Sequence, residues 1–276
     1  MFFCLMSPDA ETFITEKAIR EALKTELFGR GLIEVHQQIG STNTRAKELA
    51  LSGTGEGTLV IAESQTAGRG RLGRSWHSPP GSNIYLSLVL KPKLQPARVP
   101  LLTLAAGLAA SKAIEGVIGQ TPAVKWPNDL LLSHRKVAGI LAEMDIKDSH
   151  VSFVVLGIGI NVNLSESELP AELAAQAGSL FMATGRKWNR VEILSAFLHE
   201  MEKYYYILCQ GRYEEILTPY RAVCQTLGTH VRFVRQSRLI EGKARDVAQS
   251  GELTVELSDG KIIYLAAGEV SSLPTG

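Results

Sequence analysis

The chain has 276 residues, of which 45% are hydrophobic and 21% are charged, and its formal net charge is +1. This length predicts one large domain or two unequal ones with a sizeable core, and the balanced charge excludes a general attraction to nucleic acid or anionic membranes. Three cysteines without a CxxC motif argue against a disulfide framework and against a structural zinc site.

At the N-terminus, residues 1–11 are apolar over a short run only and lack a basic front region, so we expect no signal peptide. No uninterrupted apolar run in the chain reaches the roughly 20 residues that a bilayer-spanning helix needs. We therefore expect a cytoplasmic protein that is not attached to a membrane.

The pattern of apolar residues then predicts alternating helices and strands. Helices are expected over 11–27, after Ser41-Thr42-Asn43, over 100–118 and over 191–208. The helix over 100–118 is apolar on nearly all sides, which is typical of a buried helix. Strands are expected over 32–39, 58–64, 83–92, 123–126, 136–145 and 150–163, whereas residues 166–187 are weakly patterned.

From residue 227 onward the composition changes. Short strand-like runs alternate with turn signals at Gly228, Gly242, Gly251 and the Asp259-Gly260 pair. Short strands with frequent turns indicate a small all-β barrel. We therefore divide the chain into a large domain of residues 1–224 and a small domain of residues 225–276.

The loop after the strand at 58–64 carries the strongest local signal. Residues 63–76 read ESQTAGRGRLGRSW, and no acidic residue occurs between Glu63 and Glu115. Glycine permits close approach of backbone N–H groups to a ligand, and arginines neutralise negative charge. The loop is therefore expected to bind an anion.

Two phosphate-binding motifs overlap this loop, and neither fits. Gly68, Gly70 and Gly73 match G-x-G-x-x-G, but Pro79, Pro80 and Gly81 follow where the motif needs the start of a helix. The match of Gly68–Ser75 to a Walker loop fails for the same reason and has arginine in place of lysine.

Together with its companion motifs, the loop resembles the biotin protein ligases (biotin–acetyl-CoA-carboxylase ligases). The motifs are Ser41-Thr42-Asn43, GRGRLGRSW, VKWPNDL at 124–130, RKVAGILAE at 135–143 and GIGINVN at 157–163. The resemblance implies an α+β fold, with a mixed β-sheet packed against helices and an SH3-like C-terminal barrel. It also implies that ATP with Mg²⁺ activates biotin to biotinyl-5′-AMP, and that a lysine of the biotin carboxyl carrier domain of a carboxylase then accepts the biotin.

The resemblance also assigns roles to particular residues. Arg69, Arg71, Lys136, Lys125 and Asp129 would take part in catalysis, with Asp129 orienting or deprotonating the acceptor lysine. Biotin would be bound by Ser41, Thr42, Asn43, Gln65, Arg69, Gly70, Arg71, Lys136 and Gly139. The nucleotide would be bound by Arg71, Arg74, Trp76, Lys125, Asn128 and Asn161. No residue is assigned to a metal ion, because Mg²⁺ is expected to arrive with ATP.

Each assignment has a structural alternative. The arginine loop could be a solvated basic turn, Ser41-Thr42-Asn43 a helix N-cap, Lys136 a solvent-facing lysine at a strand edge, and Asp129 part of an Asx turn. Trp76 could be a buried core residue instead of a platform for adenine.

Alternatives remain at the level of function too. A lipoate or octanoate ligase of the same superfamily would also acylate a lysine, and a non-catalytic sensor would bind biotinyl-AMP without turnover. Too few residues precede the catalytic pattern for the DNA-binding domain that some family members carry, so no DNA partner is expected. Family members often dimerise, which leaves a homodimer open.

Overall fold

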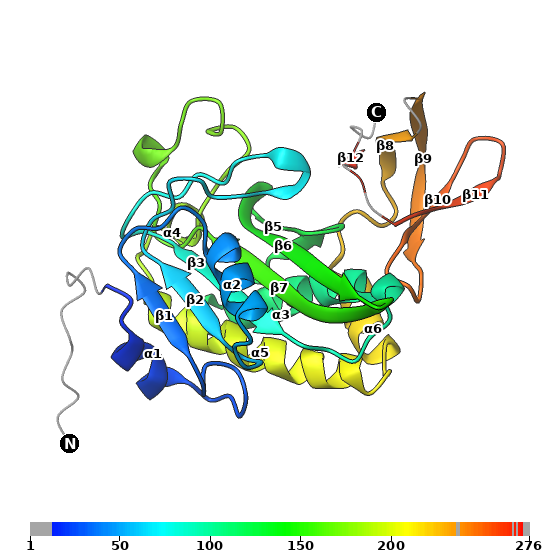
Figure 1. The fold of residues 1–276 in the computed structure, drawn as a ribbon. Coiled ribbons are helices and arrows are strands. Elements are labelled where there is room, and N and C mark those ends of the chain that lie inside the picture. The colour runs from blue at the N-terminus through cyan, green and yellow to red at the C-terminus, as the bar shows by residue number, and fades with distance from the viewer. Residues whose placement is uncertain (1–12, 236–237, 267, 269, 273–276) are drawn as a thin grey trace, which may run out of the picture.

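The computed structural model describes residues 13–235, 238–266, 268 and 270–272, so the N-terminal stretch considered for a signal peptide, with Cys4, lies outside the described residues. The larger part of the molecule is built on a seven-stranded sheet in the order β1-β2-β3-β7-β6-β5-β4 (Figure 1). Its strands are β1 (Ile33–His36), β2 (Leu59–Ala62), β3 (Ile84–Leu90), β4 (Ala123–Lys125), β5 (Asp129–Leu132), β6 (Arg135–Lys147) and β7 (His150–Ile160). Strands β1 and β2 are parallel and the other neighbours antiparallel, so the predicted mixed sheet is confirmed.

Helices cover the two faces of this sheet unequally. The helices are α1 (Glu16–Ala22), α2 (Thr42–Leu51), α3 (Pro100–Ile118), α4 (Leu180–Thr184), α5 (Arg190–Cys209) and α6 (Glu214–Val223). Helix α3 packs on the sheet and is itself covered by α5 and α6, whereas α2 lies alone on the opposite face, against β2, β3 and β7 (Figure 1).

Successive side chains of β7 point to opposite faces of the sheet, which explains why α3 packs on one face and α2 on the other. Val154, Leu156 and Ile158 point into the large core beneath α3, and Phe153 and Val155 point into the small apolar cluster beneath α2. Continuing that second face along the strand, the next two positions are Gly157 and Gly159. Large apolar side chains therefore support α2, and glycines follow where the helix begins.

Helix α3 is the core helix that the sequence predicts, with the same bounds. By length and composition alone the segment Pro96–Ile118 would suffice to cross a membrane, but 67% of its most apolar window is buried inside the protein. The sheet, α5 and α6 cover that apolar surface, which accounts for its composition.

The predicted helix over 11–27 is shorter in the structure, where α1 ends at Ala22. The buried carboxylate of Glu202 accepts hydrogen bonds from the N–H groups of Glu26, Leu27 and Phe28 at 2.7–2.8 Å. These N–H groups therefore have a partner outside a helix, and the chain turns here instead of continuing the helix.

The C-terminal module is a five-stranded antiparallel sheet in the order β11-β10-β9-β8-β12, which agrees with the predicted SH3-like barrel (Figure 1). Its strands are β8 (His230–Arg235), β9 (Arg238–Val247), β10 (Leu253–Glu256), β11 (Ile262–Leu265) and β12 (Ser271–Ser272). Buried Trp126 joins the module to the large sheet, because its backbone N–H donates to Thr226 Oγ1 at 3.0 Å and its indole N–H to the Gly251 carbonyl at 3.1 Å. The domain boundary at residue 225 stays a prediction.

Candidate active site

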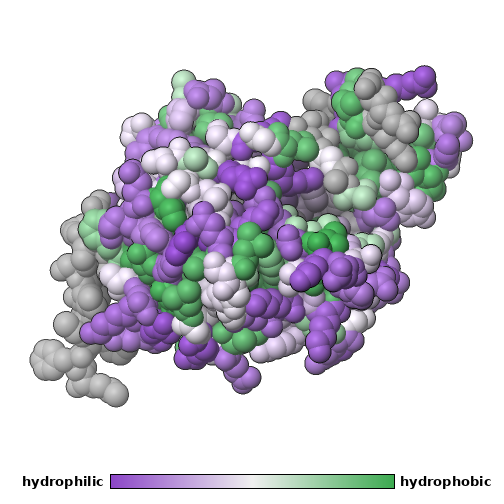
Figure 2. Space-filling view, in the orientation of Figure 1, coloured by the Kyte–Doolittle hydropathy of each residue, from purple (hydrophilic) through white to green (hydrophobic). Residues whose placement is uncertain are grey.

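A cavity of about 150 Å³ opens on the α2 face of the sheet, beyond the N-terminus of α2. Most residues that sequence analysis assigned to the site line it, together with Gly268 and Val270 of the C-terminal module. A neighbouring hollow of about 400 Å³ shares the arginine loop with it and reaches the start of α3. In Figure 2, hydrophilic side chains gather between the main body of the molecule and the C-terminal module.

Glycines form the floor of the cavity, because nothing larger fits there. A Cβ added to Gly157 would lie 2.0 Å from Asn43 Oδ1, and one added to Gly159 would lie 2.5 Å from the Trp76 indole. A Cβ on Gly139 of the adjacent strand would lie 2.7 Å from the same indole. The Gly-rich sequence of β7 therefore makes room for Asn43 and Trp76 directly above the sheet.

Uncharged polar groups gather at the N-terminus of α2. The Thr42 N–H and hydroxyl donate to Gln65 Oε1 at 2.9 and 3.1 Å, and the Ser87 hydroxyl lies 2.8 Å from Thr42 Oγ1 and 2.6 Å from Asn43 Oδ1. The Ser41 side chain makes no capping hydrogen bond, although Ser41 is the N-cap residue. The simple N-cap interpretation therefore does not account for this residue. Sequence analysis missed Ser87, which reads as an ordinary strand position.

The arginine loop folds back on itself as a short hairpin. Arg69 pairs with Ser75 in an isolated bridge, and the N–H of Gly70 donates to the Arg74 carbonyl at 2.7 Å. At the tip is a single 3-10 turn (Arg71–Gly73), in which Leu72 has a left-handed backbone with φ of 55°. This turn is not the helix that a dinucleotide-binding loop requires, so the rejection of that motif is consistent with the structure.

Two arginines of this loop are held at the cavity by side chains from β6 and from the turn between β4 and β5. Arg69 forms an ion pair with Glu143 at 3.0 Å, and Glu143 also accepts from the Asn43 amide at 3.0 Å. Arg71 donates to Asn128 Oδ1 at 2.9 Å. Arg71 is thus held by a partner at the cavity, whereas Arg69 is paired but still about half exposed. Sequence analysis assigned no role to Glu143, although it is the last residue of the RKVAGILAE motif, because a glutamate in a strand reads as a solvent-facing position.

Lys136 and Asp129 both line the cavity and contact each other there. The Lys136 ammonium lies 2.6 Å from Asp129 Oδ1 and 5.2 Å from the centre of the Trp76 ring. The contact with Asp129 is an ion pair, not an aligned hydrogen bond. Lys125 and Arg74 also line the cavity. The lysine is therefore directed into the site, and the alternative of a solvent-facing edge lysine does not apply.

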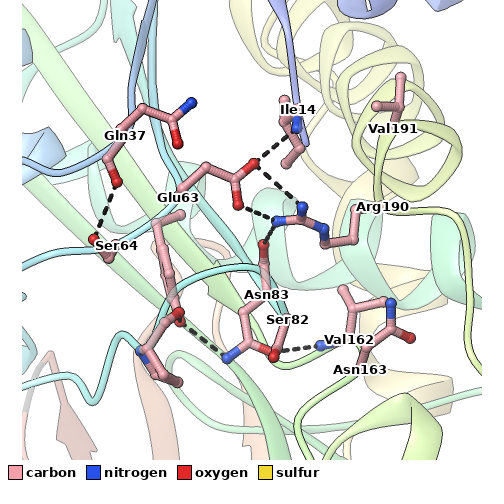
Figure 3. Close-up of polar contacts among 12 residues, drawn as sticks. Ile14, Gln37, Glu63, Ser64, Ser82, Asn83, Val162, Asn163, Arg190 and Val191 are labelled. Carbon is pink, nitrogen blue, oxygen red and sulfur yellow. Dashed lines mark hydrogen bonds and ion pairs between the residues drawn. The ribbon is translucent and has the colours of Figure 1, made fainter. Parts of the chain in front are cut away.

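Both ends of the segment that carries the arginine loop are fixed by one buried ion pair. Figure 3 shows the Arg190 guanidinium between the Glu63 carboxylate, at 2.7 Å, and the backbone carbonyl of Asn83, at 3.0 Å. Glu63 directly follows β2 and Asn83 directly precedes β3. The Asn83 amide donates to the hydroxyl of Tyr85, and burial raises the pKa of that hydroxyl above its usual range.

Asn161 is the one assigned residue that the structure places outside the cavity. Among the described residues it is not part of the cavity lining, and its side-chain amide is buried and donates to the Gly178 carbonyl at 2.9 Å. The reason is that β7 ends at Ile160, so the chain leaves the sheet before Asn161 can follow Gly157 and Gly159 onto the cavity floor. This geometry does not support the expected direct contact of Asn161 with a nucleotide, which stays a prediction.

Comparisons with known proteins agree with this geometry. Residues 35–161 match the biotin/lipoate A/B protein ligase family, and residues 226–272 match the biotin protein ligase C terminal domain. The chain is 39% identical to the bifunctional ligase/repressor BirA of Bacillus subtilis, over 92% of this chain and 78% of that protein. It is 35% identical to the biotin--[acetyl-CoA-carboxylase] ligase of Mycobacterium tuberculosis, over 94% of this chain and 96% of that protein. A solved structure of the biotin protein ligase from Aquifex aeolicus in complex with biotin and ATP superposes with a TM-score of 0.74 at 29% identity, covering 88% of this chain and 99% of that one.

Proposed function

The chain belongs to the biotin protein ligase family, and from this premise we propose that it activates biotin with ATP and transfers it to a lysine of a biotin carboxyl carrier domain. The acceptor would be the carrier domain of acetyl-CoA carboxylase or of a related carboxylase. The observation that carries the proposal is the grouping of three cations, Arg69, Arg71 and Lys136, around a cavity whose α2 side is lined by uncharged hydrogen-bonding groups.

In the first step, a carboxylate oxygen of biotin would attack the α-phosphorus of ATP. The bond from that phosphorus to the bridging oxygen would break, and pyrophosphate would leave. The two reactants are anions, so positive charge fixed in advance lowers the cost of bringing them together and stabilises the charge on the transition state. We assign this task to Arg69, Arg71 and Lys136. The Gly70 N–H is already bonded to the Arg74 carbonyl within the loop, and the space above Gly139 is taken by the Trp76 indole.

The two ends of biotin require different surroundings. Its ureido ring is neutral and both donates and accepts hydrogen bonds, so uncharged amides and hydroxyls suit it. Ser41, Thr42, Asn43 and Gln65 would bind this ring. The carboxylate end of biotin would face the cations and the nucleotide.

The nucleotide would be held by residues of the arginine loop and of the segment around Pro127. Arg74, Lys125 and Asn128 would contact ATP together with Arg71, and Trp76 would stack on adenine. Mg²⁺ would enter bound to the phosphates of ATP and offset part of their charge.

In the second step, the acceptor lysine would attack the acyl carbon of biotinyl-5′-AMP, and AMP would leave. The amine must lose a proton to become a nucleophile. Asp129 is the assigned carboxylate for orienting that amine or taking its proton, and its ion pair with Lys136 at 2.6 Å supports this assignment. We extend the proposal to a cytoplasmic enzyme that acts without DNA or a membrane. We also propose that it can form a homodimer, and analytical sedimentation would test this oligomeric state.

One assay separates this proposal from its alternatives. The purified chain is incubated with a carrier domain and either labelled biotin or labelled lipoate, with and without ATP. Transfer of label from biotin, only when ATP is present, is the expected result. Transfer from lipoate alone would replace the proposal with a lipoate ligase, and tight biotinyl-AMP binding without transfer would indicate a sensor.

A further inference from the structure

Strand β6 contains an irregularity at the point where Lys136 enters the cavity. Opposite β5, Leu130 pairs with Ala138 and Leu131 pairs with Lys136, so Val137 is an extra residue on β6. Such a β-bulge redirects the side chains on one side of it. Gly139 of the same strand faces the cavity, because a Cβ there would meet the Trp76 indole, whereas Ile140 packs into the large core. Lys136 is an odd number of positions from Gly139. In a regular strand Lys136 would therefore point to the opposite face, into the core beneath α3.

A second segment of the chain holds this bulge in place. Residues 176–178, from the weakly patterned region, run beside Lys136 as a short parallel bridge. The Lys136 N–H donates to the Gln176 carbonyl at 2.7 Å, and the Gly178 N–H donates to the Lys136 carbonyl at 2.9 Å. Both backbone groups of Lys136 are thus bonded to this segment, which we call the 176–178 clamp.

Asn161 connects the clamp to the bulge. Its backbone N–H donates to the carbonyl of Val137, the extra residue, at 2.8 Å, and its side-chain amide donates to the Gly178 carbonyl at 2.9 Å. Its own carbonyl accepts from the Leu180 N–H at 3.0 Å. The side chain is buried, with Asn161 5% exposed, so the Gly178 carbonyl would have no water to replace this bond if the amide were removed.

We propose that Asn161 is a positioning residue for Lys136, acting through the 176–178 clamp to maintain the bulge that turns the lysine into the cavity. This inference rests on the proposed function, since it is adenylation that requires the ammonium to be held near the reacting carboxylate. It also gives the weakly patterned region a role that the sequence did not suggest.

The test compares Asn161→Ala with Asn163→Ala. Asn163 is the matched control because its side chain anchors the same region elsewhere, donating to the Trp188 carbonyl at 2.9 Å and accepting from the Trp188 N–H at 2.8 Å. Two measurements are made on each purified variant: biotin-dependent ATP–pyrophosphate exchange, and the rate at which an amine reagent modifies Lys136, followed by peptide mass spectrometry.

For Asn161→Ala we expect kcat of exchange to fall about 10- to 100-fold, because a displacement of about 1 Å has effects of this size. The KM for biotin should change little, because the residues assigned to the ureido ring are untouched. Lys136 should be modified several times faster as its contact with Asp129 loosens. Asn163→Ala should change neither readout.

The modification rate tests the inference even if the chain proves not to activate biotin, so failure of the proposed function and failure of this inference are distinguishable. An unchanged modification rate of Lys136 in Asn161→Ala would overturn the inference. If the KM for ATP also rose, Asn161 would instead be interpreted as a nucleotide-binding residue. If Asn161→Ala does not fold, Gly178→Ala decides. A Cβ there would lie 2.7 Å from Arg135 Cβ and displace the clamp directly, so it should reproduce the loss of exchange and the faster modification.

Discussion

Replacing Arg190 with methionine would leave the Glu63 carboxylate in the interior of the protein without its charged partner. The side chains of Arg190 and Glu63 are 4% and 1% exposed, so water cannot take over the lost interactions. Glu63 would keep the Ile14 N–H, at 2.7 Å, and the Asn83 carbonyl would lose its bond to the guanidinium (Figure 3).

Removing one partner of such a buried pair costs about 3–5 kcal/mol of unfolding free energy, out of a typical total of about 5–15 kcal/mol. With a urea dependence of about 3 kcal/mol per M, the unfolding midpoint should fall by about 1–1.7 M. The double variant Glu63→Gln/Arg190→Met should recover much of this loss, because its carboxamide is neutral and still offers an oxygen to Ile14.

Urea unfolding followed by circular dichroism measures these midpoints. Arg212→Met is the control, because Arg212 and its partner Glu215 are about half exposed and such pairs contribute little, so its midpoint should match that of the unaltered chain. If the double variant is no more stable than Arg190→Met, a stranded charge is not the cause of the loss and the reasoning fails.

Three further predictions concern the site and the surface. Lys136→Ala should abolish ATP–pyrophosphate exchange while circular dichroism shows an intact fold, and near-normal exchange would refute its assigned role. Gly157→Ala should raise the KM for biotin at least about tenfold in transfer assays, because the new Cβ would lie 2.0 Å from Asn43 Oδ1 and overpacking has costs of a few kcal/mol. The hydrogen bond from Arg45 lowers the pKa of Glu34 to about 2 from its ordinary value of 4.5, so this carboxylate stabilises the fold above its ordinary pKa. The excess unfolding free energy of the unaltered chain over Glu34→Gln should therefore shrink as the pH falls from about 4.5 to about 2, and a pH-independent difference would contradict the assignment.

The sequence predicted most of the sheet and the two long helices, because these elements are long and their burial is periodic. Helix α3 has the predicted bounds and α5 differs from its prediction by one residue at each end. Strand β5 was missed because its four residues begin with the last residue of the KWPND motif and are too few to show alternation. Helix α6 was missed as well, and Pro219 inside it is a signal that normally ends a helix.

The candidate site could be assembled from motifs because the motifs supply residue types that the chemistry needs. They could not supply the partners that hold those residues. Ser87 belongs to no motif, Glu143 ends the RKVAGILAE motif without an assigned role, and the two meet Asn43 and Arg69 only in the folded chain. Local patterns describe which residues are near in sequence, whereas these contacts join positions that are 44 and 74 residues apart.

Lys136 and Asn161 show why a motif indicates that a residue matters without indicating how. Strict alternation places Lys136 in the core and Asn161 on the cavity floor, and the structure has both the other way round. The two departures have linked causes: an extra residue in β6 reverses the direction of Lys136, and the end of β7 at Ile160 frees Asn161 to bind that extra residue. One inserted residue in β6 thus moves the Lys136 side chain from one face of the sheet to the other. Backbone pairing with another segment stabilises the inserted residue. The position of the ammonium is therefore decided by long-range backbone pairing, which no periodicity in the sequence of β6 records.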